Sequence, residues 1–97
     1  MTHTLTLVAT ITAQAGQQTA VEGHLRTLVA ASREEAACIQ YDLHQQQDAP
    51  HVFIMIEQWR DAAALAEHKE TAHYQAFSTT CGPLLQGVEL KLMNKIA

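Results

Sequence analysis

The side chains best suited to chemistry gather between Val52 and Phe77. An apolar run from Val52 to Ile56 leads to Glu57 and to Trp59, the only tryptophan of the chain. Two histidines and two more aromatic residues follow in what reads as a short helical segment: His68, His73, Tyr74 and Phe77. An apolar pocket with a few ionisable groups at its rim suits a flat, weakly acidic organic substrate.

His68 is the candidate general base of such a site. Its position predicts a place at the end of a short helix, near the end of the strand that carries Trp59. A neutral imidazole there suits proton abstraction, because its reference pKa of about 6.5 is close to working pH. The alternative is a histidine that caps the helix end or supports the fold by a hydrogen bond.

Glu57 is an acid inside an apolar strand, where period two places it on the face of Phe53 and Trp59. A carboxylate in such surroundings needs a partner. Glu57 is therefore either buried in the pocket with a partner, or faces a dimer seam and pairs with Arg33, Arg60 or the other subunit. We expect a structural or orienting role.

The remaining candidates would line the pocket and bind substrate. His73 and Phe77 are four residues apart and share a helix face, with Tyr74 beside it. Tyr41, on a neighbouring strand, can offer a phenolic donor to a bound ring, and His24 lies near the buried edge of the first helix. More simply, Tyr41 is a half-buried strand residue and Phe77 belongs to the core.

The sequence predicts neither a metal site nor a cofactor. His68 and His73 are five residues apart, so on one continuous helix they face different sides, and a zinc site built on them is not expected. A glycine-rich dinucleotide fingerprint, a phosphate-binding loop and an H-E-x-x-H motif are all missing from the sequence.

The size and composition predict one small globular domain spanning residues 1–97. Charged residues make up only 16%, which indicates that a partner covers part of the surface. The net charge of −4, without a basic stripe, argues against nucleic acid, and no apolar run is long enough for a membrane span. Cys38 and Cys81 lack a C-x-x-C arrangement and are read as reduced thiols of a cytoplasmic protein.

Hydrophobic periodicity predicts the first half of the fold. Alternation of apolar and polar residues predicts a strand over residues 5–11, and a helix is expected over residues 17–35. Alternation of Ile39, Tyr41 and Leu43 predicts a second strand, followed by a hairpin loop over residues 45–50. The third strand, residues 51–59, is apolar on both faces and should be covered on both sides.

The second half repeats the pattern. Asp61 is a natural N-cap for a helix over residues 62–66, a second short helix is expected over residues 70–80, and Val88, Leu90 and Leu92 mark the last strand. The order β-α-β-β-α-β predicts a ferredoxin-like α+β fold, an antiparallel sheet with helices on one face. A second copy packed sheet to sheet would cover the other face, so we expect a homodimer.

Three segments together resemble the antibiotic biosynthesis monooxygenase family: residues 37–44, the strand end Ile56-Glu57-Gln58-Trp59, and residues 68–77. The E-x-W pattern, the following histidine and the later H-[YF]-x-x-[FY] pattern keep the family's spacing over nearly the whole chain. The strand around Trp59 is similar to the quinol monooxygenases, whereas His68-Lys69, Thr71 and His73-Tyr74 also resemble the enzyme that processes phosphorylated autoinducer-2. One departure is Ala37, where the family commonly has glycine.

The resemblance implies a dimeric α+β barrel that oxidises quinols or related phenols with dioxygen, without metal or flavin. It also implies that Trp59 lines the pocket and donates its indole N–H to substrate or peroxy oxygen, with a core tryptophan as the alternative. Two other functions stay open. An isomerase of a small phosphorylated diketone would need a cationic clamp, for which Lys69 and Arg33 are candidates. A non-catalytic dimer would bind aromatic ligands without turnover.

Overall fold

The computed structural model describes residues 4–97 as one four-stranded sheet with three α-helices and a short 3₁₀ helix. The elements follow in the order β1 (Leu5–Ala13), α1 (Gln18–Ser32), β2 (Cys38–Gln46), β3 (Ala49–Trp59), α2 (Ala62–Lys69), α3 (Ala72–Cys81), η1 (Gly82–Leu84) and β4 (Leu85–Met93).

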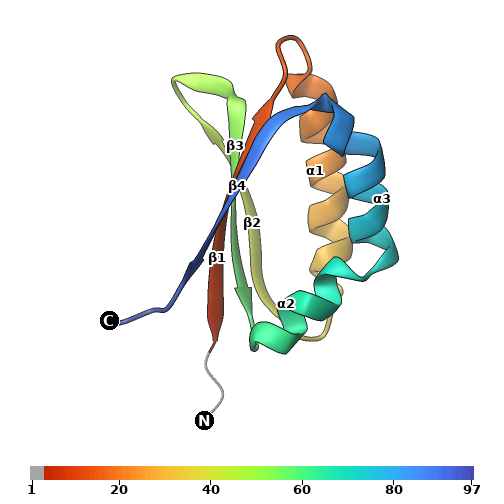
Figure 1. Ribbon diagram of the computed structural model, residues 1–97. Coiled ribbons are helices and arrows are strands. Elements are labelled where there is room, and N and C mark those ends of the chain that lie inside the picture. The colour runs from red at the N-terminus through yellow and green to blue at the C-terminus, as the bar shows by residue number, and fades with distance from the viewer. Residues whose placement is uncertain (1–3) are drawn as a thin grey trace.

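The sheet has the strand order β2-β3-β1-β4, and every neighbouring pair is antiparallel. All three α-helices lie on one side of it and leave the other side open (Figure 1). This is the ferredoxin-like α+β arrangement that the periodicity of the sequence predicts. The topology places β3 in the sheet interior, between β1 and β2, so the E-x-W end of β3 has a strand on each side.

The core lies between the sheet and the helices. From Phe53 to Trp59 on β3, the residues facing the helices are buried, and the alternate residues on the open face are only half-buried. Four residues of α1 at helical spacing pack beneath the sheet: Val21, Leu25, Leu28 and Ser32. The apolar side chains on the open face of β3, such as Ile54 and Ile56, therefore lack the cover that the inner face receives.

Two details of the β2–β3 hairpin differ from expectation. The expected six-residue loop over residues 45–50 is wrong, because both strands extend through it to a turn at Gln47 and Asp48. The expected face shared by Ile39 and Tyr41 is also wrong, because the pairing with β3 shifts by one residue between Cys38 and Gln40. This bulge leaves Ile39 exposed, and Tyr41 faces the core.

Side-chain caps separate the two short helices. The Asp61 carboxylate accepts a hydrogen bond from the Ala64 N–H at 2.8 Å, which starts α2 as expected. Thr71 caps α3 by accepting from the Tyr74 N–H, and its hydroxyl donates to the carbonyl of His68 at 2.7 Å. The expected start of the second helix near Glu70 therefore moves to Ala72, and two short helices flank a tight turn.

The edge strand β4 carries exposed apolar side chains on the helix-facing side. In register, Val88 pairs with Ile11 and Leu90 with Ala9, both of which are buried core residues. Val88 and Leu90 nevertheless remain 52% and 46% exposed, so the layer between sheet and helices is open along this edge. Across residues 4–97, helices long and apolar enough to cross a membrane are absent. Cys38 and Cys81 are both free thiols.

Candidate active site

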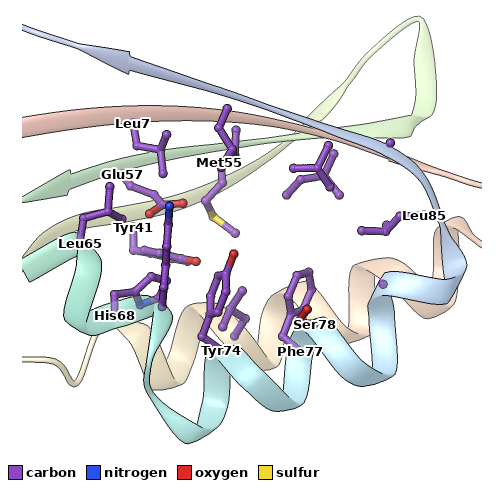
Figure 2. Close-up of a pocket in the computed structure, with 18 residues that line it drawn as sticks. Leu7, Tyr41, Met55, Glu57, Leu65, His68, Tyr74, Phe77, Ser78 and Leu85 are labelled. Carbon is purple, nitrogen blue, oxygen red and sulfur yellow. The ribbon is translucent and has the colours of Figure 1, made fainter.

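A cavity of about 350 Å³ lies between the sheet and helix α3. Figure 2 shows Leu7, Met55 and Glu57 reaching into it from the strands, while Tyr74 and Phe77 reach toward them from α3. Most lining residues are apolar, and the half-exposed Val88 and Leu90 are among them. The cavity therefore opens beneath β4, and its size suits a ligand of one or two rings.

Five of the eight predicted site residues line this cavity: Tyr41, Glu57, His68, Tyr74 and Phe77. They come from β2, β3, α2 and α3, so distant parts of the chain meet as expected. The other three, Trp59, His24 and His73, are not among the lining residues. His24 sits half-buried on α1, and the expectation that it reaches the pocket is wrong.

Trp59 lies behind the cavity wall instead of in it. The side chain is fully buried, and its indole Nε1–H donates to the Glu57 Oε1 at 2.9 Å. The expected hydrogen bond to substrate or peroxy oxygen therefore does not fit, because the only N–H of the indole is already used. Trp59 instead holds the carboxyl group of Glu57 and packs against the ring of His68, with 4.5 Å between the ring centroids.

Glu57 lies at the cavity itself, whereas the sequence indicates only a structural or orienting role. Its carboxyl group lines the cavity, and neither Arg33 nor Arg60 forms an ion pair with it in the part of the chain described. Burial raises the pKa of Glu57 to about 7, although the hydrogen bond from Trp59 and the charge of Lys69 act in the opposite direction. The cavity thus contains a carboxyl group that can take up or release a proton near neutral pH.

His68 presents one ring nitrogen to a carboxylate and leaves the other without a partner. Its Nδ1 lies 2.7 Å from the Glu35 Oε2, and because a carboxylate oxygen only accepts, Nδ1 carries the hydrogen. The Nε2 atom is buried and has no hydrogen-bond partner within residues 4–97. Burial, together with the charges of His73 and Lys69, lowers the pKa of His68 below its ordinary value although Glu35 acts in the opposite direction. The ring is therefore neutral at neutral pH, and Nε2 holds a lone pair.

Aromatic rings enclose His68 on several sides. Its ring centroid lies 5.1 Å from that of Tyr74 and 5.5 Å from that of Tyr41. Burial and the nearby charge of Glu57 raise the pKa of both tyrosines, so both hydroxyls remain protonated at neutral pH. The cavity therefore combines an acceptor on His68 with two phenolic donors, in otherwise apolar surroundings.

Glu35 belongs to the candidate site, although the sequence did not indicate it. The expected helix over residues 17–35 would include it, but that end of the helix is wrong, because α1 ends at Ser32 and Glu35 lies in the loop before β2. Its Oε2 also accepts from the His73 Nε2 at 2.7 Å, so one carboxylate oxygen joins both histidines. The expectation that His68 and His73 face different sides of one helix is wrong, because the turn after Lys69 separates α2 from α3 and turns the two rings toward each other.

The two candidate cations of a phosphate clamp are not brought together. Lys69 lines the cavity, but Arg33 donates to the carbonyl of Tyr41 and to the Asp42 carboxylate. Among the described residues that line the cavity, Lys69 is therefore the one lysine or arginine. A single ammonium group is a weak basis for binding a phosphorylated substrate.

The comparisons with known proteins agree on one family. The family model described as antibiotic biosynthesis monooxygenase matches residues 4–80. The solved structure of PA3566 from Pseudomonas aeruginosa superposes with a TM-score of 0.95 at 52% identity, covering 100% of this chain and 98% of that one.

Two curated relatives also have names that describe monooxygenases. YcnE from Bacillus subtilis, provisionally named a monooxygenase, is 44% identical over 52 residues. That match covers 54% of this chain and 55% of YcnE, so it spans only about half the length of that relative. Rv0793 from Mycobacterium tuberculosis, named in the same provisional way, is 27% identical over 88% of this chain and 83% of its own length.

Proposed function

Because the chain belongs to the antibiotic biosynthesis monooxygenase family, we propose that it oxidises a small quinol or related phenol with dioxygen. The reaction takes place in the cavity beneath the sheet, and His68 acts as the general base. The observation that carries this proposal is the imidazole of His68, which belongs to a residue lining the cavity. Its Nε2 is buried without a hydrogen-bond partner among residues 4–97, and Glu35 sets its tautomer.

The proposed chemistry needs no electron donor other than the substrate. His68 Nε2 takes a phenolic proton, and the resulting anion gives one electron to dioxygen. The two radicals join at a ring carbon as a peroxide, which takes a proton back and loses water to leave a new carbonyl group. One quinol and one dioxygen thus yield one hydroxyquinone and one water, and all four electrons come from the ring.

The neighbouring groups would support this step. The protonated Tyr41 and Tyr74 can donate to the substrate oxygen as negative charge develops on it. Lys69 offers a positive charge at the same wall, and the apolar lining limits the access of water to reactive intermediates. Glu57, held by Trp59, can receive or return the second proton of a quinol.

We also propose that the working unit is a homodimer. The open sheet face presents half-buried apolar side chains at its centre, where Val8 pairs in register with Ile56. A second copy packed against this face would remove these side chains from water. The charge of −4 offers no support for a nucleic-acid partner.

The test is oxygen uptake with a panel of reduced quinols and polyphenols in the presence of a metal chelator. We expect uptake by the native chain and a loss of about 100-fold or more in His68→Ala, the usual scale for removing a general base. His24→Ala is the matched control, because that histidine does not line the cavity. Both variants are first checked for native thermal unfolding.

Three outcomes would contradict the proposal. An unchanged oxygen-uptake rate in folded His68→Ala would exclude His68 as the base. Binding of quinols with no oxygen uptake by the native chain would favour a non-catalytic ligand-binding protein. Turnover of a phosphorylated diketone without oxygen uptake would instead favour the isomerase reaction.

A further inference from the structure

A cluster of three potential metal ligands joins His68 to Glu35 and His73, neither of which lines the cavity. The His68 Nδ1, the His73 Nε2 and the Glu35 Oε2 lie within 4.8 Å of one another. They come from the end of α2, the start of α3 and the loop after α1. We propose that Glu35, His68 and His73 form a binding site for a divalent transition metal of the zinc type, and that the metal switches off the base.

The donor set matches this class of metal. Two imidazole nitrogens and one carboxylate oxygen suit zinc and its neighbours and leave a fourth position for water. Each nitrogen now lies 2.7 Å from the Glu35 Oε2. Tetrahedral bonds of about 2.0–2.1 Å would require these separations to widen by about half an ångström. That is a small adjustment for a side chain in a surface loop.

The site has an approach from solvent that avoids the substrate cavity. The side chains of Glu35 and His73 are 18% and 26% exposed, whereas that of His68 is only 2% exposed. Neither Glu35 nor His73 lines the cavity. A metal ion can therefore reach the outer two ligands first and then displace the hydrogen from the His68 Nδ1.

Displacing that hydrogen changes the chemistry of the other ring nitrogen, Nε2. A neutral imidazole carries one hydrogen, so metal on Nδ1 requires the hydrogen to sit on Nε2. The buried Nε2, which has no partner among residues 4–97, then becomes a donor and can no longer accept a substrate proton. Metal binding at the outer face would thus inhibit the enzyme without blocking the cavity.

The binding test uses the untagged full chain and zinc sulfate in an isothermal titration. We expect one zinc per chain, and an affinity lowered by more than about 100-fold in both Glu35→Gln and His73→Ala. The control is the triple variant His24→Ala, His44→Ala and His51→Ala, which removes three histidines outside the cluster and should bind like the native chain. Binding that disappears in this control but survives in Glu35→Gln would overturn the proposal.

The tautomer is read directly from imidazole nitrogen NMR of the native chain. We expect the His68 hydrogen on Nδ1 without metal and on Nε2 with zinc. Zinc bound at one per chain with the hydrogen still on Nδ1 would overturn the switch.

The inhibition rests on the proposed function, whereas the binding does not. With a para-quinol substrate, which does not chelate metal, zinc should stop oxygen uptake by the native chain, and chelator should restore it. In His73→Ala, zinc should no longer lower the rate of oxygen uptake relative to the rate of the same variant without metal. No uptake without metal would contradict the proposed function alone, and uptake unchanged at saturating zinc would contradict the switch alone.

Discussion

Glu57 shows how burial changes the role of a single side chain. The sequence places it on one face of its strand with Phe53 and Trp59, but leaves open whether that face lines the pocket or a dimer seam, and how much water reaches it. Removal from water is the largest influence on its pKa. The charged or titratable groups that interact with it are Lys69, Glu35, Tyr41, Tyr74 and Cys38. A carboxyl group with a pKa of about 7 can exchange a proton at neutral pH, which makes Glu57 a candidate for a role in the site.

Glu57 should also make stability depend on pH. Its folded-state pKa of about 7 lies above the reference value of 4.5, so the folded chain holds a proton that the unfolded chain releases. The Glu57 contribution is therefore neutral below about pH 4.5, becomes destabilising as the pH rises, and levels off above about pH 7, at a total cost of about 3 kcal/mol.

Glu57→Gln removes this titration and keeps the shape of the side chain. The free energy of unfolding of the variant, relative to the native chain, should rise by about 3 kcal/mol between about pH 4.5 and pH 8. Denaturant unfolding at the two pH values measures this difference. A variant whose relative stability is the same at both would show that the folded-state pKa is not raised.

At the scale of elements, short helices fix the position of the proposed base. His68 lies in the last turn of α2, and Asp61 caps the first turn. The turn that follows, closed by the Thr71 hydroxyl on the His68 carbonyl, directs α3 so that His73 meets Glu35. The capping residue can be predicted from the sequence, but the angle between the two helices depends on how they pack.

Removing the α2 cap should lower stability by a predictable amount. Asp61→Ala deletes the carboxylate that accepts from the Ala64 N–H, at a cost of about 1 kcal/mol. Glu67→Ala removes an exposed carboxylate from the same helix and should change stability by less than about 0.5 kcal/mol. Thermal or denaturant unfolding compares the two, and equal losses would argue against the cap.

At the scale of the whole molecule, the one-sided arrangement of helices leaves the sheet half covered. Figure 1 shows one face of the sheet with no element against it. The edge strand β4 adds further exposed apolar side chains at the opening of the cavity, among them Val88 and Leu90. The proposed dimer would cover the open face, and its formation can be tested separately from catalysis.

Light scattering should give a mass of two chains for the native protein at micromolar concentration. Val8→Glu places two like charges in the proposed seam and should weaken association by on the order of 100-fold or more. Ala20→Glu adds the same charge on the exposed side of α1 and should leave the dimer intact. A one-chain mass for the native protein would rule out the dimer under these conditions.

The sequence by itself determined the order of elements, which residues share a face of β3, and the Asp61 cap, because each depends on residues close together in the chain. It also identified His68, Tyr41 and the aromatic residues of α3 as neighbours, with the help of family spacing. The tertiary structure alone decided that Trp59 supports Glu57, that His24 lies outside the cavity, and that Glu35 joins His68 to His73. These relations depend on which atoms meet across the packed interior and on how far water is excluded, and neither is encoded in local periodicity.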